Sequence, residues 1–234
     1  KSDAFKVMFN GDAYVSSTLY VGGTAVTATA LSSVTEEANT GARISTSNAS
    51  NHGDIGSNAV DLSYSSSSSS TRGATGNNSI AMGFNTTASG FASTASGNAS
   101  TASGYASTAM GLFTTASGGY STAMGEETTA SGNYSTAMGG YSTASGQNST
   151  AMGFNTTASD YASTVIGIFN SSGSSATSAN SFSTSAPAFV IGNGTNSSNK
   201  SDAFKVMFNG DTTVSNDLTV SGDVVISSDA RLKS

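Results

Sequence analysis

The stretch TASGNYSTAMGGYST, residues 129–143, consists mostly of small residues and repeats its pattern every seven positions. The pattern runs from position 81 to position 171 as thirteen units, which begin AMGFNTT, ASGFAST and end ASDYAST, VIGIFNS. A coiled coil shares this period, but its seam needs two large apolar residues per unit. Here the recurring residues are Ala, Gly and Ser or Thr, and glycine disfavours a helix by roughly 1 kcal/mol relative to alanine. The period therefore indicates a repeat built from strands.

Each unit alternates in the way that an extended chain requires, with successive side chains on opposite faces. The segment STAMG places Ser, Ala and Gly on one face and Thr and Met on the other. Two variable residues follow each glycine, as FN, NA, YA, GY, EE or QN, and we expect the chain to bend there with little restriction on residue type. Each unit is thus predicted to be a short strand and a bend, and two units to form one fourteen-residue coil of a narrow solenoid.

A second period, of fourteen residues, makes the two outer faces of this solenoid different. Methionines recur on one face, and serines take the same place in the alternate units. A methionine column is apolar surface that a single chain would expose, and burying each side chain against a partner contributes roughly 1.5–3 kcal/mol. The alternative is that the methionines fill the coil interior. The column that we expect to face a partner consists of Met82, Met110, Met124, Met138, Met152 and Ile166.

Aromatic residues gather at the predicted bends, mixed with Asn and Gly. Exposed aromatic side chains with amide neighbours suit contacts with sugars or proteins. The alternative is that each ring stacks on the next coil and covers the thin core. The candidates for contact with a glycan or protein on a host surface are Tyr105, Tyr120, Tyr134, Tyr141 and Tyr161.

Composition argues against several classes of function. Only 9% of the residues are charged and the net charge is −6, so no basic stripe is available for nucleic acid. No apolar run approaches the length of a membrane-spanning helix, and without cysteine neither a disulfide nor a thiolate metal site can form. His52, the only histidine, is followed by Gly53 and Asp54 in a segment that we interpret as a turn, and Glu126 and Glu127 as solvated corner residues. We therefore expect no enzymatic activity, cofactor or metal.

The flanks repeat on a larger scale. Residues 1–23 return at 200–222 with 17 of 23 positions identical, and each copy alternates before an Asn-Gly turn. This pattern predicts β-hairpin connectors. The intervening residues 24–73 are expected to be irregular, although 55–65 has the character of an imperfect coil.

The stretch NNSIAMG at 77–83, followed by units such as STASG and STAMG, resembles the YadA-type head of trimeric adhesins. The resemblance covers roughly residues 55–192. It implies an all-β fold, a left-handed parallel β-roll of fourteen-residue coils in which three chains pack around an axis. The methionine column is then the expected homotrimer interface, and the thin single-chain interior is consistent with a need for three copies.

The segment SDARLK, residues 228–233, resembles the start of the endosialidase-type intramolecular chaperone that ends many phage tail fibres. The resemblance implies that Ser228 is a nucleophile and Lys233 its base in a self-cleaving dyad once the chaperone body follows. The chain alone is not expected to cut itself. The ending favours a phage or viral tail fibre over the alternative, a bacterial trimeric autotransporter adhesin.

The predicted organisation follows from these observations. The units are a hairpin connector (1–23), an irregular segment (24–73), a β-roll head (74–192), a second hairpin connector (193–226) and the start of a chaperone (227–234). We expect a structural and adhesive fibre segment on a virion or outside the cell, with no partner among nucleic acids or membranes. A further alternative rests on the ladder Thr115, Ser117, Thr129, Ser131, Thr143 and Ser145, which resembles the threonine arrays of ice-binding solenoids.

Overall fold

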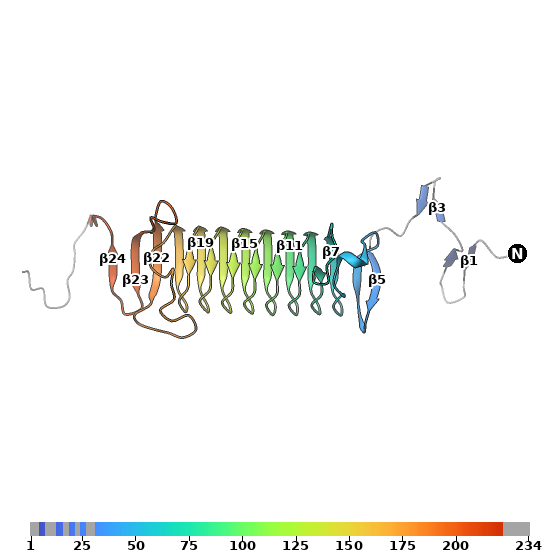
Figure 1. Ribbon diagram of the computed structural model, residues 1–234, viewed down its shortest axis with the longest axis horizontal. Coiled ribbons are helices and arrows are strands. Elements are labelled where there is room, and N and C mark those ends of the chain that lie inside the picture. Colours follow the sequence, from blue (N-terminus) through green and yellow to red (C-terminus); the bar gives the residue numbers. More distant parts are fainter. Residues whose placement is uncertain (1–4, 8–12, 16–18, 22–23, 27–30, 222–234) are drawn as a thin grey trace, which may run out of the picture.

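The computed structural model describes the backbone of residues 5–7, 13–15, 19–21 and 24–26, and both backbone and side chains of residues 31–221. Its main body is a long, straight β-solenoid (Figure 1). Helix within the described ranges is limited to one 3₁₀ turn, η1 (Ala49–Asn51), and none of it could span a membrane. Ser228 and Lys233 lie outside the described residues.

Two parallel sheets form the solenoid. The long sheet contains β7 (Val60–Tyr64), β9 (Ile80–Phe84), β11 (Thr94–Asn98), β13 (Thr108–Leu112), β15 (Thr122–Glu126), β17 (Thr136–Gly140), β19 (Thr150–Phe154), β21 (Thr164–Ile168) and β22 (Pro187–Asn193). The short sheet contains β8 (Gly73–Ala74), β10 (Thr87–Ala88), β12 (Thr101–Ala102), β14 (Thr115–Ala116), β16 (Thr129–Ala130), β18 (Thr143–Ala144) and β20 (Thr157–Ala158).

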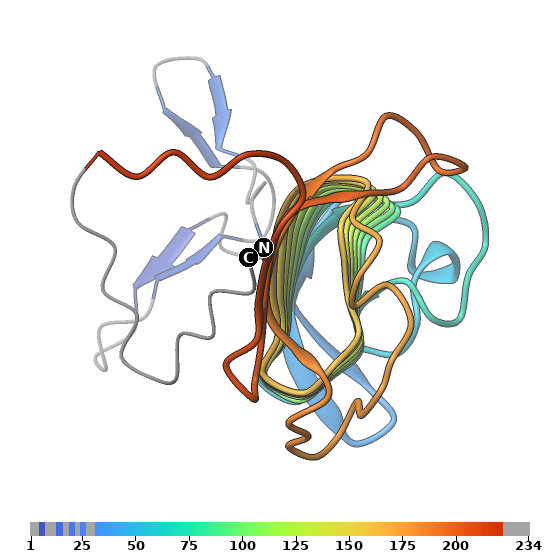
Figure 2. The same cartoon turned by 90° about the vertical axis from the view of Figure 1, so that its left-hand side faces the viewer.

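The register between neighbouring strands confirms the predicted coil. Ala109 pairs with Ala123 and Met110 with Met124 in the long sheet, and Thr115 pairs with Thr129 in the short sheet. Every such pair is fourteen residues apart, so one coil comprises two of the seven-residue units. Seen along its axis, the solenoid shows its coils overlaid in one narrow outline (Figure 2).

The interior of the regular coils holds small side chains. Each regular coil contributes two alanines and two hydroxyl residues that are at most 1% exposed. In the coil of β15, for example, these are Ser121, Ala123, Thr128 and Ala130. The predicted alternation is therefore correct, and the alternative that methionines fill the interior is wrong, because Met110 is 41% exposed.

The bends are more restricted than expected. The second variable residue of each bend has a left-handed backbone, with φ of 56° at Tyr120 and 51° at Glu127. This conformation is unfavourable for residues other than glycine. The bend is nevertheless held by the preceding coil, because the Tyr120 N–H donates to the Tyr105 carbonyl at 2.7 Å and the Glu127 N–H to the Leu112 carbonyl at 2.8 Å. Hydrogen bonds between coils thus continue around the corners and offset the backbone strain.

The N-terminal end of the long sheet is covered by an antiparallel hairpin of β5 (Leu31–Glu36) and β6 (Asn39–Ile44), and β6 pairs in parallel with β7. Segment 24–73 is therefore less irregular than expected, and β7 lies within the imperfect coil. Two further hairpins precede it, β1 (Phe5–Val7) with β2 (Ala13–Val15) and β3 (Leu19–Val21) with β4 (Thr24–Val26).

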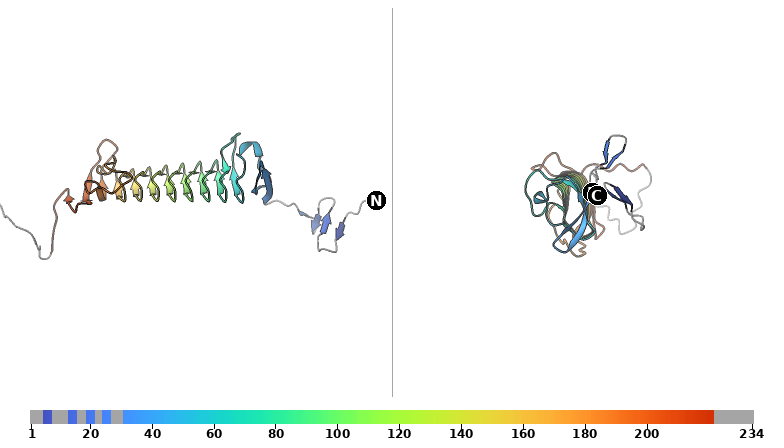
Figure 3. Two further views of the ribbon diagram at one scale, coloured as in Figure 1. Left: turned by 90° about the horizontal axis from the view of Figure 1, so that it is seen from below. Right: turned by 90° about the vertical axis from the view of Figure 1, so that its right-hand side faces the viewer.

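The C-terminal end is covered by a hairpin of β23 (Asp202–Met207) and β24 (Thr212–Val214), in which β23 pairs antiparallel with β22. The short sheet ends differently. The Asn170 side chain accepts from the Thr157 N–H at 2.8 Å and donates to the Thr157 carbonyl at 2.9 Å, taking the hydrogen bonds that another strand would make. The hairpins β5–β6 and β23–β24 are visible at the two ends of the regular coils (Figure 3).

Candidate interaction surfaces

Five of the six residues of the predicted methionine column form one row on the outer face of the long sheet. Met110, Met124, Met138, Met152 and Ile166 are paired from strand to strand, with Cα atoms in register. Neighbouring strands in a sheet lie about 4.8 Å apart, so these side chains are neighbours along the solenoid. Met82 has the same register but is separated from the row by Ser96. Exposed fractions of 37% at Met82 and 38% at Met124 leave apolar surface uncovered in the single chain.

Other apolar residues extend this face. Phe84 and Phe154 belong to the aromatic residues expected at the bends, whereas no sequence pattern singled out Ile80 and Ile168. All four begin or end the same strands and are 37–45% exposed. The period-two alternation that identified the methionines would have found them, since residues two positions either side of a methionine share its register. These residues are Ile80, Phe84, Phe154 and Ile168.

Three of the five candidate tyrosines form a stacked row with Phe91. Ring centroids are 5.1 Å apart for Phe91 and Tyr105, 5.2 Å for Tyr105 and Tyr120, and 5.1 Å for Tyr120 and Tyr134. The row lies where the chain passes from the short sheet to the long sheet, and its four rings are 45–55% exposed. Phe91 stacks on Tyr105 and Tyr120 stacks on Tyr134, whereas the planes of Tyr105 and Tyr120 are tilted by 57°. Each tyrosine of the row therefore has one face covered by its stacking partner.

The remaining two candidates are not part of this row. Tyr141 lies at the opposite corner, where its ring centroid is 5.5 Å from that of Phe154. Tyr161 lies at the corner of the row, but the coil carrying Gln147 and Asn148 separates it from Tyr134. The predicted set is therefore divided between two corners.

At Tyr120 and at Tyr141 the surroundings disfavour ionisation of the hydroxyl group. Loss of solvation, followed by the nearby Tyr105 and Tyr134 hydroxyls, raises the pKa of Tyr120 above its usual value. The Glu127 carboxylate and then the Glu126 carboxylate raise the pKa of Tyr141. At neutral pH these side chains are hydrogen-bond donors.

A buried ionic cluster closes the N-terminal end of the solenoid, and no sequence pattern predicted it. Asp61 is fully buried and pairs in register with Ala81, so it occupies a position where the regular coils have alanine. The Arg43 guanidinium lies 3.2 Å from the Asp61 carboxylate and 2.7 Å from the Glu36 carboxylate, and it donates to the Gly53 carbonyl at 2.9 Å. One arginine thus joins β5, β6, β7 and the loop after η1.

His52 belongs to this cluster and does not form the simple turn with Asp54 that we predicted. Its Nδ1 lies 3.1 Å from the Asp61 carboxylate, which also accepts from the Ser63 hydroxyl at 2.6 Å. A Ser-His-Asp triad places histidine between the acid and the serine. Here the same Nδ1 lies 3.1 Å from the Asp61 carboxylate and 3.5 Å from the Ser63 hydroxyl, so acid and serine share one ring nitrogen, and the cluster has the geometry of a structural plug.

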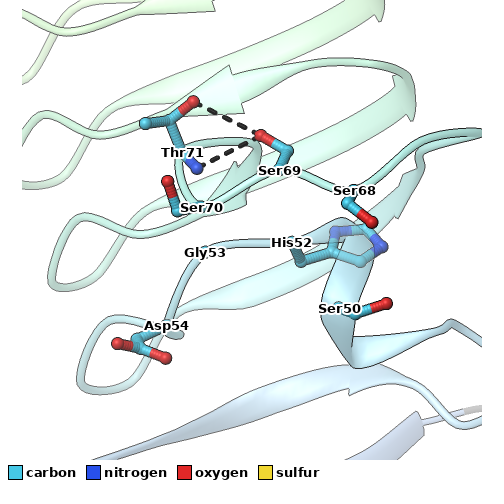
Figure 4. Close-up of a pocket in the computed structure, with 8 residues that line it drawn as sticks. All are labelled: Ser50, His52, Gly53, Asp54, Ser68, Ser69, Ser70 and Thr71. Carbon is cyan, nitrogen blue, oxygen red and sulfur yellow. Dashed lines mark hydrogen bonds between the residues drawn. The ribbon is translucent and has the colours of Figure 1, made fainter.

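Next to the plug is an open pocket of about 660 Å³, which Figure 4 shows. It is lined by Ser50, His52, Gly53, Asp54, Ser68, Ser69, Ser70 and Thr71. Serine hydroxyls dominate its wall, and the Ser69 hydroxyl accepts from the Thr71 N–H at 3.2 Å. In the part of the chain with described side chains, no three His, Cys, Asp or Glu residues are arranged to hold a metal ion.

The environment of His52 predicts that the stability of the N-terminal end of the solenoid depends on pH. Burial lowers the pKa of His52 below its usual value of 6.5, although the Asp61 carboxylate opposes this effect. Below pH 6.5 the histidine of the unfolded chain binds a proton more readily than His52 of the folded chain. The stability of the N-terminal end is therefore expected to fall as the pH decreases from 6.5 towards the lower pKa that His52 has in the folded chain. Hydrogen exchange of β7 should therefore accelerate between pH 6.5 and 5 after correction for intrinsic exchange, and His52→Gln should remove this dependence. An equal acceleration in β15 would contradict the prediction.

Comparison with known proteins identifies a family of repeats in the coils. The family model described as YadA head domain repeat (2 copies) matches residues 74–90, 88–114, 116–142 and 144–169. These segments span the regular coils from β8 to β21, so this part of the chain carries YadA head repeats and the resemblance seen in the sequence is confirmed for it. No curated protein matches the chain significantly.

Proposed function

We propose that this chain is a structural and adhesive segment of a homotrimeric surface fibre, in which three left-handed rolls pack through their methionine columns. The observation that supports this most is the continuous apolar row on the long sheet, in a chain whose interior holds mainly Ala, Ser and Thr. Alanines bury little area each, so the core supplies little of the apolar burial that stabilises a fold. The side chains of the methionine row lie outside, where packing against two other copies would bury them.

The trimer is tested by placing charge in the row. The variant Met124→Asp with Met138→Asp is expected to dissociate the assembly, because each contact would bury uncompensated carboxylates. Light scattering should report the mass of one chain where the native protein has the mass of three. The matched control is Ser117→Asp with Ser131→Asp, which puts the same charges on the outer face of the short sheet and should leave the trimer intact. A native protein that is monomeric, with its β-structure retained in circular dichroism, would refute the proposal.

The adhesive role rests on the row formed by Phe91, Tyr105, Tyr120 and Tyr134, hereafter the aromatic row. Its exposed rings and tyrosine hydroxyls suit a glycan or protein on a host surface. Tyr120→Ala with Tyr134→Ala should lower adsorption to host cells by about tenfold, the effect of losing roughly 1.4 kcal/mol of binding free energy. Tyr141→Ala, at the opposite corner, serves as the control for position. Unchanged adsorption by a double variant that remains trimeric would exclude this site.

The fibre is proposed to be exposed outside the cell or on a virion. The YadA head repeats support a bacterial trimeric autotransporter adhesin, whereas the SDARLK segment favours a phage or viral tail fibre. We favour the tail fibre. Expression with the adjoining downstream sequence distinguishes the two: release of a chaperone fragment after Ser228, abolished by Ser228→Ala, is expected for the tail fibre, and an outer-membrane anchor for the adhesin.

A further inference from the structure

The second copy of the 23-residue repeat, which we call the module, lies against the C-terminal end of the roll. Its strand β23 covers the last coil by pairing with β22, Phe204 opposite Ile191 and Lys205 opposite Val190. The Phe204 and Phe189 ring centroids are 6.2 Å apart. The N–H of Phe208 donates to the Ala186 carbonyl at 3.1 Å, which extends the contact past the end of the strand.

A carboxylate fixes the same module to the preceding loop. The two oxygens of Asp202 accept from the N–H groups of Ser171 and Ser172, at 2.8 and 2.9 Å. The module therefore attaches to the end of the roll by a strand, aromatic contacts and this carboxylate.

The first copy preserves the residues that make this attachment. Positions 1–12 and 200–211 are identical, so Asp202, Phe204 and Phe208 have counterparts 199 positions earlier. The six differences between the copies fall at 212, 213, 216, 217, 219 and 221, and all six residues of the second copy are exposed. The pairing is also the same: Phe5 lies opposite Val15 in β1–β2, as Phe204 lies opposite Val214 in β23–β24.

Both ends of the roll in this chain already carry a hairpin. The last coil strand β22 pairs with β23, and the first coil strand β7 pairs with β6, which in turn pairs with β5. We propose that the hairpin β1–β2 is the end cap of another YadA-type roll, and that it pairs with a last-coil strand of the same kind as β22, PAFVIGN. Residues 1–23 would then close one head while the following residues begin the next.

The direct test extends the full chain with a second copy of residues 24–199 placed immediately before Lys1. Hydrogen exchange followed by mass spectrometry reports the β22 strand of each roll, and a Ser185→Thr marker in the added copy distinguishes their peptides. We expect the added β22 to exchange within about threefold of the original. Phe5→Asp with Val7→Asp should accelerate the added strand by about tenfold or more and leave the original unchanged. Fast exchange of the added β22 whether or not Phe5 and Val7 are intact would overturn the proposal.

A chimera gives an independent test in the chain at its present length. Converting residues 200–222 to the sequence of 1–23 needs only the six substitutions Thr212→Ala, Thr213→Tyr, Asn216→Ser, Asp217→Thr, Thr219→Tyr and Ser221→Gly. The chimera should keep the native protection of β22. The comparison variant Phe204→Asp with Val206→Asp, which removes apolar side chains of the pairing strand, should lose it. Equal loss in the chimera would show that the first copy cannot act as this cap.

Discussion

Gly125→Ala is expected to disrupt the solenoid at β15 and to lower its free energy of unfolding by about 3 kcal/mol or more. Two independent causes act at this position. The backbone φ of 123° is one that residues with a side chain rarely adopt, and an added Cβ would lie 2.0 Å from the Gly139 carbonyl oxygen in the next coil. Gly139 is itself paired in register with Gly153 of the following coil, so its carbonyl oxygen cannot move away without shifting that coil as well. Thermal and urea unfolding followed by circular dichroism would measure the loss.

Gly119→Ala is the matched control. Gly119 precedes Tyr120 at a bend, and its φ is not in the left-handed region. An added Cβ would meet only the Asn133 side chain, whose Oδ1 would be nearest at 3.4 Å, an ordinary contact. Other bends already carry Phe91 or Tyr105 at this position. The control is expected to change the stability by less than about 0.5 kcal/mol. Equal effects of the two substitutions would show that close contact between glycines does not set the spacing of the coils.

Arg43→Met is the second substitution with a large expected effect. Removing the guanidinium leaves the Asp61 carboxylate buried with a largely neutral His52, and separates Glu36 from its cationic partner. Breaking one side of a buried ion pair typically costs about 3–5 kcal/mol. The N-terminal end should therefore open, with rapid exchange and proteolysis in β5, β6 and β7 while β13 to β19 remain protected.

Arg72→Met provides the same change of charge close by. Arg72 donates to the hydroxyls of Ser65 and Ser67 and has no carboxylate within 4.0 Å among the residues with described side chains, so only a small effect is expected. A rescue variant tests the cause. Arg43→Met combined with Asp61→Ala gives the first coil the alanine of the regular coils and should recover much of the lost protection. Failure of this rescue, with Arg72→Met equally harmful, would refute the role of the cluster.

The regular coils could be predicted because every seven-residue unit repeats the same alternation of inner and outer residues. Ser121 and Ala123 alternate with Thr122 and Met124, and this pattern sets the inner and outer faces without any knowledge of distant contacts. The fourteen-residue recurrence of methionine then gives the register between coils. Fold and outer face are thus readable from local sequence.

The ends could not be predicted in the same way. Arg43 meets Asp61 eighteen residues away, and His52 meets it nine residues away, in a segment where no period signals the register. Charged residues in a Ser-rich region usually remain in water, so burial of this group was unexpected. Asn170 is similarly inconspicuous in the sequence, since it takes the place of a small hydroxyl residue at the last turn.

Because the coil is twice the length of the repeated unit, the two lengths have different consequences for how such a protein can change. Gain or loss of fourteen residues alters the length of the rod by one step of about 4.8 Å and returns every side chain to its former side. Gain or loss of seven residues exchanges the sheets, so the sulfur-containing side chains beyond that point would move to the opposite side of the rod. Lengthening by duplication is therefore expected to proceed in pairs of heptads, with the end structures carried along unaltered.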